Sequence, residues 1–214
     1  MRDLPGWWPL LAALGVAVAF IAAGYYATKR RREAYEVFCL THGFGYQAEL
    51  EGYHSSYVDV AALFARNGRC DHFITGRGDG GGFAAFEYSY PVGKSRRSFG
   101  VMHWQGEEAS LPKFSVAPEG FWQRVGQKLG LQDIDFPEDP DFSGAYQLQG
   151  VDEAAIRALF TPAVRRFFAH NRGNHIAGAG RHLFWWRLGT LPRPDELDTF
   201  LAEGDGIRRT LVRS

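Results

Sequence analysis

The chain has 214 residues, of which 45% are hydrophobic and 22% are charged, and this balance excludes a disordered protein. The formal net charge is zero, but residues 1–32 hold five basic residues and one acidic residue, so residues 33–214 hold 19 basic and 23 acidic residues with a net charge of −4. A nucleic-acid-binding domain would show a basic stripe, so we expect no nucleic-acid partner.

An uncharged apolar run occupies residues 7–27. At ~1.5 Å per residue, 21 helical residues span ~31 Å, which matches the hydrocarbon thickness of a bilayer. Aromatic residues mark both ends, as is typical of membrane interfaces. The chain is therefore divided into an N-terminal tail (1–6), a transmembrane helix (7–27), a basic juxtamembrane segment (28–33) and a soluble domain (34–214).

Four consecutive basic residues, Lys29 to Arg32, follow this run, whereas Arg2 on the other side is balanced by Asp3. The asymmetry predicts an N-terminus outside and a cytoplasmic domain at the cell inner membrane. A cleaved signal peptide is the alternative, but it would carry its charges before a shorter apolar run. Membrane lipid is thus an expected partner.

Aromatic and β-branched segments predict the strands of the domain. We expect strands at 72–75, 83–90, 97–104 and 113–116, joined as an antiparallel meander because the gaps are too short for helical crossovers. Further strands are expected at 142–148, 175–178 and 182–188, of which the last two pair.

Capping residues and apolar periodicity predict short helices. The first follows the membrane helix after a short break and ends at His42-Gly43. The others are expected at 58–65, 119–129, 151–160, 161–170 and 194–202. The segment 133–141 is expected to be a loop, and 207–212 a strand or a helix.

Two segments look alike. Val58-Asp59 before two alanines resembles Val151-Asp152, and each copy precedes a Gly-containing, aromatic hairpin. Two related helix-plus-hairpin units sharing one sheet are therefore a hypothesis within the predicted fold class, α+β with a mostly antiparallel sheet and short helices.

The Gly-rich stretch 76–82 contains G-x-G-x-x-G. A dinucleotide site requires a helix after the glycines, and here a strand is expected. The lysine, H-R-D and D-F-G elements of a kinase are absent from the sequence. A hairpin turn is the better interpretation.

Metal and nucleophile motifs are equally weak. The two cysteines, Cys39 and Cys70, are expected to be unpaired and partly buried. The histidines lack zinc-site pairing, and the acidic segment 133–141 lacks EF-hand spacing. No G-x-S-x-G is present. We therefore assign no catalytic, cofactor-binding or metal-binding residue and expect no cofactor. The histidines are these: His42, His54, His72, His103, His170, His175 and His182.

Trp185 and Trp186 are adjacent on an expected strand and should face opposite sides of the sheet. One is expected in the core, and the other is a candidate for an exposed partner surface.

The segment 111–119, with its L-P-x-F-x-x-x-P-E pattern, and the segment 142–160 resemble a family of bacterial single-pass membrane proteins with a domain of unknown function. The family shares an anchor, an early His-Gly-Phe and a Gly-turned aromatic hairpin. The resemblance implies no activity and no site residues.

Two functions remain. The first is a membrane-anchored cytoplasmic interaction or regulatory module without catalytic activity, which recognises a protein partner or the membrane face. The second is a membrane-associated enzyme whose site is built from dispersed histidines and acids, and a pocket of converging groups would favour it.

Overall fold

The computed structural model describes residues 7–106, 110–121 and 131–212. The expected helix at 119–129 lies largely outside these residues. The elements follow in chain order: α1 (Trp8–His42), β1 (Gly45–Leu50), the 3-10 helices η1 (His54–Tyr57) and η2 (Ala62–Ala65), β2 (Arg69–Gly78), β3 (Gly81–Val92), β4 (Ser95–Gln105), β5 (Leu111–Pro118), β6 (Gln132–Asp133), α3 (Pro140–Ser143), β7 (Tyr146–Gly150), α4 (Glu153–Leu159), α5 (Pro162–His170), β8 (His175–Gly180), β9 (His182–Leu188) and α6 (Pro194–Val212).

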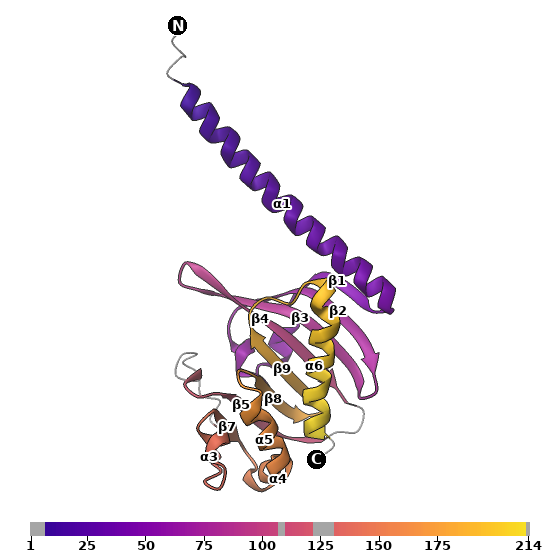
Figure 1. Cartoon of the computed structure of the whole chain (residues 1–214), viewed down its shortest axis with the longest axis vertical. Coiled ribbons are helices and arrows are strands. Elements are labelled where there is room, and N and C mark those ends of the chain that lie inside the picture. The colour runs from indigo at the N-terminus through magenta and orange to yellow at the C-terminus, as the bar shows by residue number, and fades with distance from the viewer. Residues whose placement is uncertain (1–6, 107–109, 122–130, 213–214) are drawn as a thin grey trace.

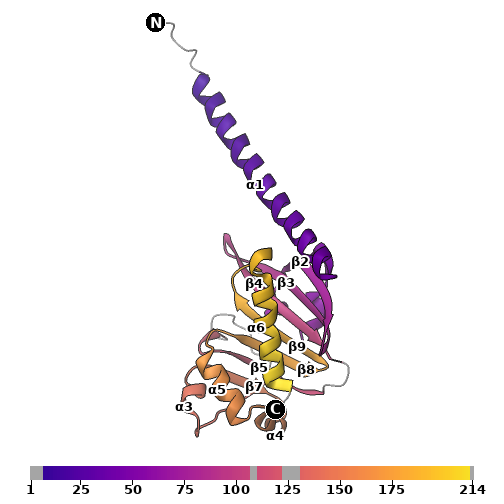
Figure 2. The ribbon, with the colours of Figure 1, turned by 45° about the vertical axis from the view of Figure 1, so that its right-hand side comes forward.

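The N-terminal helix α1 projects away from the rest of the protein, and only its last turns lie against the sheet (Figures 1 and 2). The apolar part contains an 18-residue window with a mean hydropathy of 2.0, none of it buried, so α1 is long and apolar enough to cross a membrane. The expected break after the apolar run is wrong, because α1 is one uninterrupted helix of 35 residues from Trp8 to His42. The helix ends where predicted, at Gly43 with φ of 68°, a conformation that favours glycine.

One antiparallel sheet of nine strands forms the body of the domain, in the order β1-β2-β3-β4-β9-β8-β5-β7-β6. The α+β fold is thereby confirmed. The hairpins β2–β3–β4 and β8–β9 were predicted correctly. The continuous meander is wrong, because β4 pairs with β9, and β5 lies between β8 and β7.

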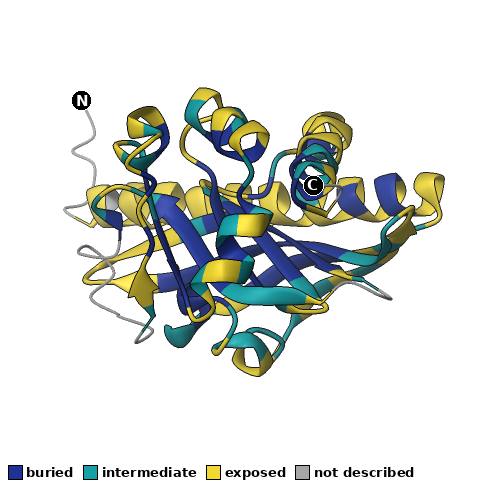
Figure 3. Ribbon diagram, turned by 90° about the horizontal axis from the view of Figure 1, so that it is seen from below, coloured by how far each residue is buried: buried dark blue, intermediate teal, exposed yellow. Residues whose placement is uncertain are grey.

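Both faces of the sheet are covered, so its central strands are dark blue in Figure 3. One face packs against α1, α6 and the α3–α5 group. The segment with η1 and η2 covers aromatic side chains on the other face. Trp185 and Trp186 point to opposite faces as expected, but both are fully buried, so an exposed tryptophan is excluded at these positions.

Several helices and strands differ from their predicted bounds. The expected helix at 58–65 is only η2, without a side-chain cap at its start. Strand β1 was not predicted. The segment 142–148 begins in α3 and becomes a strand only at Tyr146. Helix α6 extends to Val212, because packing on the sheet overrides the glycines at 204 and 206.

Helices α4 and α5 begin as predicted. Asp152 accepts a hydrogen bond from the Ala155 N–H at 3.0 Å, and Thr161 accepts one from the Val164 N–H at 3.5 Å. The two Gly-turned hairpins do share one sheet, but the first is preceded by 3-10 turns where the second is preceded by α-helices. The two hairpins thus share one sheet, and the relation between the two units stays a prediction.

Candidate functional site: the junction between α1 and the sheet

Two side chains of α1 attach this helix to the domain. The Arg31 guanidinium donates to the Glu87 carboxylate on β3 at 3.0 Å and to the Leu191 carbonyl in the β9–α6 loop at 2.9 Å. One turn later, the Tyr35 hydroxyl donates to the Pro192 carbonyl at 2.6 Å. Residues four apart lie on one face of a helix, so both side chains reach the same loop.

The Glu87 carboxylate is the centre of this network. Its side chain is 11% exposed, and the Leu191 N–H also donates to it at 3.3 Å. A carboxylate with so little exposure is costly unless it is paired and hydrogen-bonded. Arg31 supplies the charge, while its own side chain remains 34% exposed. The network thus joins α1, β3 and the β9–α6 loop.

A β-bulge in β2 adds an aromatic contact to the junction. The register shifts between Asp71 and Ile74, and His72 takes a φ of 52°. Its ring centre lies 4.5 Å from that of Tyr35, and its Nδ1 is 2.9 Å from the Tyr46 hydroxyl. Burial, together with the charge of Arg31, lowers the pKa of His72 to about 4. The His72 ring is therefore neutral at physiological pH.

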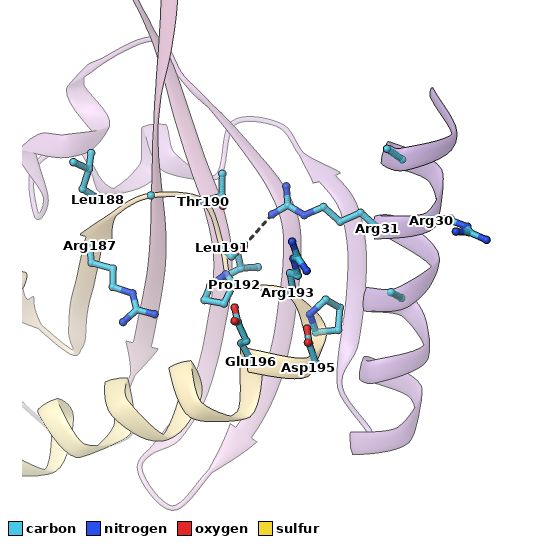
Figure 4. A pocket seen from close by; sticks show the side chains of 14 residues that line it. Arg30, Arg31, Arg187, Leu188, Thr190, Leu191, Pro192, Arg193, Asp195 and Glu196 are labelled. Carbon is cyan, nitrogen blue, oxygen red and sulfur yellow. Dashed lines mark hydrogen bonds between the residues drawn. The ribbon is translucent and has the colours of Figure 1, made fainter. Parts of the chain in front are cut away.

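Beside this network, a cleft of about 970 Å³ opens between α1 and the β9–α6 loop. Figure 4 shows Arg31 reaching from α1 to Leu191, whereas the Arg30 side chain points away from the cleft. Arg187 and Arg193 line the loop side, and Arg187 is held by Glu203 at 2.7 Å. The cleft therefore has arginines on both of its walls, together with Asp195 and Glu196 at the start of α6.

A second cluster lies on the opposite face of the sheet. The Tyr53 hydroxyl is hydrogen-bonded to His103 Nδ1, and His103 Nε2 lies 3.0 Å from His182 Nδ1. A cavity of about 270 Å³ adjoins Tyr53 and His103. Burial, and secondarily the neighbouring His182, lowers the pKa of His103 to about 3. Among the described residues, those that line this cavity include no carboxylate, so the enzyme hypothesis gains a pair of histidines but no acid from this part of the chain.

The other histidines do not converge. His42 lies 3.4 Å from Asp198, His170 bonds to its own helix, and His175 stacks near Trp186. Across the described ranges, no three His, Cys, Asp or Glu side chains are placed to hold a metal ion. Cys39 and Cys70 are both free and buried, as expected.

The remaining sequence candidates serve the fold. The Gly-rich stretch is the β2–β3 turn, with Gly78 opposite Gly81, and Gly81 has a φ of 109°. Within the acidic segment, Asp139 pairs with the buried Arg165 at 3.1 Å. An S-x-x-K spacing is also present at Ser110–Lys113, but Lys113 lies within the extended strand β5 and Ser110 directly before it. Residues three apart then face opposite sides.

Sequence reasoning missed the junction itself. Arg31 was grouped with the juxtamembrane charges, and its partner Glu87 is 56 residues away. One feature of the sequence indicated it: Glu87 is the only charged residue in the aromatic run 83–90. A carboxylate on a strand that is buried on both faces requires a cationic partner.

No protein-family model matches the chain, and no curated protein matches its sequence. Among solved structures, the mycobacterial trehalose monomycolate transport factor A, TtfA, matches with a TM-score of 0.54. The two chains are 12% identical, and the match covers 85% of this chain and 96% of that one. At this identity the likeness shows a shared fold. The family suggested by the segment 111–119 stays a prediction.

Replacing Arg31 with Met should destabilise the domain, because Glu87 would lose its charged partner. We expect a loss of about 1–3 kcal/mol, less than for a fully buried pair since Arg31 is partly exposed. Chemical denaturation of the full chain in detergent measures it. Arg30→Met is the matched control and should change stability by less than about 0.5 kcal/mol. Adding Glu87→Gln to Arg31→Met should recover part of the loss, and equal effects of the two arginine substitutions would refute the network.

The His103 site should make stability depend on pH. Because the pKa of His103 is about 3 in the folded protein and ~6.5 when unfolded, the unfolded chain binds the extra proton between these values. Stability conferred by the neutral ring is therefore complete above pH ~6.5 and declines as pH falls. His103→Phe should flatten the decline between pH 6 and 4 by up to about 1 kcal/mol per pH unit, whereas the exposed His170→Phe should not. An unchanged slope in His103→Phe would show that the ring is already protonated when folded.

Proposed function

We propose that this protein is a non-catalytic accessory module of the inner membrane, which presents its cytoplasmic domain to a membrane-embedded protein partner. The N-terminus lies on the outer side of this membrane, away from the cytoplasm, as the Lys29–Arg32 charges favour. One observation carries the proposal: α1 runs without interruption from the apolar segment to the Arg31–Glu87–Leu191 network. A continuous helix fixed at the junction sets both the height and the rotation of the domain relative to the bilayer.

An interaction module benefits from this constraint more than an enzyme acting on a freely diffusing substrate does. A flexible linker would be enough to keep an enzyme near the membrane. A fixed geometry keeps one face of the domain toward a partner in the same membrane. It also lowers the entropy that the domain loses when it binds, because its orientation is already restricted. The likeness to TtfA, a trehalose monomycolate transport factor, supports an accessory role without supplying a substrate.

The enzyme hypothesis is weaker. Its best candidate is the Tyr53–His103–His182 cluster, which lies on the other face of the sheet from the junction. Among the described residues, this cluster contains no acidic residue and no activated nucleophile, so the described groups do not complete either of the usual acid–base or covalent mechanisms.

Insertions in α1 test the role of the fixed rotation. Two alanines inserted after Thr28 should turn the domain by about 200° relative to the membrane segment, whereas seven residues should return it to within about 20° while lengthening the helix by about 10 Å. We expect photo-crosslinks from exposed Leu188 to a recurring membrane protein in native membranes. They should be lost with the two-residue insertion and retained with seven.

A cytoplasm-specific reporter fused to the C-terminus should be active in all three proteins and serves as the control for topology. Crosslinks that are indifferent to both insertions would refute the fixed orientation. Absence of any recurring partner, with a small molecule retained by the purified protein, would favour the enzyme. A reporter active only outside the cytoplasm would overturn the orientation.

A further inference from the structure

The tip of the β3–β4 hairpin carries an unusual set of side chains. Residues 91–97 are all exposed and include Lys94, Arg96 and Arg97 but no acid. Val92 is 46% exposed at the same tip. The turn is tight, since Val92 pairs with Ser95. The tip is therefore a well-formed hairpin end with three cations and one apolar side chain.

These cations are not neutralised by ion pairs in the part of the chain that the structure describes. Among the residues that the structure describes, none of the three tip cations is in an ion pair with a carboxylate. Arg96 donates instead to the Ser89 backbone and hydroxyl oxygens at 2.9 and 3.0 Å, which holds it beside the strand. Elsewhere the arginines commonly have acidic partners, at positions 69, 157, 165, 187, 208 and 209. The tip charge is thus uncompensated within the described chain.

The hairpin lies on the side of the domain from which α1 leaves. Figures 1 and 2 both show its tip extending beyond the other strand ends toward the α1 side. The base of the hairpin is hydrogen-bonded to the start of the β9–α6 loop. Phe99 pairs with Leu188, and the Gly189 N–H donates to the Ser98 carbonyl at 3.0 Å. Leu188 is 66% exposed, and the loop then runs to the cleft beside α1.

We infer that the β3–β4 hairpin tip is a second membrane contact. It binds the phosphate groups of anionic lipids in the leaflet that faces the domain. Basic side chains near an anionic bilayer surface are attracted to it, and an exposed valine at the same hairpin tip can enter the interfacial region. Continuity with the membrane-spanning helix favours lipid over a soluble anion. The inference deepens the proposed function, since a second contact would further fix the orientation of the domain.

The test uses the full chain in nanodiscs of phosphatidylcholine alone or mixed with phosphatidylglycerol. An environment-sensitive fluorophore is attached at Ser95→Cys, and selective labelling is feasible because Cys39 and Cys70 are buried. Quenching by a nitroxide on the lipid headgroup reports contact. We expect strong quenching in anionic nanodiscs that decreases with salt, and weak quenching in neutral ones. A label at exposed Ala158→Cys on α4, near the opposite end in Figure 1, should not be quenched in either.

Charge reversal identifies the residues responsible. The double substitution Lys94→Glu and Arg97→Glu should lower the equilibrium constant for contact between the tip and the membrane by about fivefold or more for each cation removed. The matched pair Arg166→Glu with Arg181→Glu, also exposed, should leave quenching unchanged. The salt dependence of the unsubstituted chain provides a readout that does not depend on the folding of any variant.

Equal quenching in neutral and anionic nanodiscs, or insensitivity to the Lys94 and Arg97 reversals, would overturn the inference. So would loss of quenching on adding inorganic phosphate at constant ionic strength, because that would indicate a site for the soluble anion. The nanodisc assay contains no protein partner and no cellular topology. It can therefore fail while the insertion experiment succeeds, or the reverse.

Discussion

The pairing of Arg31 with Glu87 is the interaction on which the arrangement of α1 and the domain depends. Glu87 lies between buried aromatic residues on β3, so its carboxylate has little access to bulk water. The cation comes from a helix that begins in the apolar segment. Because the same guanidinium also binds the Leu191 carbonyl, displacement of α1 would leave a carboxylate and a loop carbonyl without their donor.

The sheet makes this constraint effective by being wide and buried on both faces. Its central pair, β4 and β9, joins two hairpins that are far apart in sequence. The two adjacent tryptophans of β9 fill opposite cores, and Trp185 also donates to the Asn174 side chain at 2.7 Å. Glycine at 204 allows α6 to lie close to Met102 and Trp185, since a Cβ there would lie 2.4 Å from the Met102 sulfur. A network attached to β3 and the β9–α6 loop is thereby attached to the whole domain.

Local features of the fold could be predicted from the sequence, because they depend on local chemistry. The apolar run, the caps at Asp152 and Thr161 and the Gly-turned hairpins each have a signal within a few residues. The pairing of β4 with β9, and the place of β5 between β8 and β7, depend on contacts separated by tens of residues. The same reason explains why the junction was missed: four consecutive basic residues look equivalent in sequence, and only the fold distinguishes Arg31, which faces Glu87, from Arg30, which points away.

The central claim is that α1 and the domain form one body with a fixed geometry. Electron–electron distance measurements between spin labels at Ala13→Cys in the apolar part of α1 and Ala202→Cys on α6, in nanodiscs, test it directly. A single narrow distance distribution that broadens when Arg31→Met is introduced is the predicted result. A broad distance distribution in the labelled chain with Arg31 present, unchanged by Arg31→Met, would contradict the account. The domain would then be joined to α1 by a flexible connection.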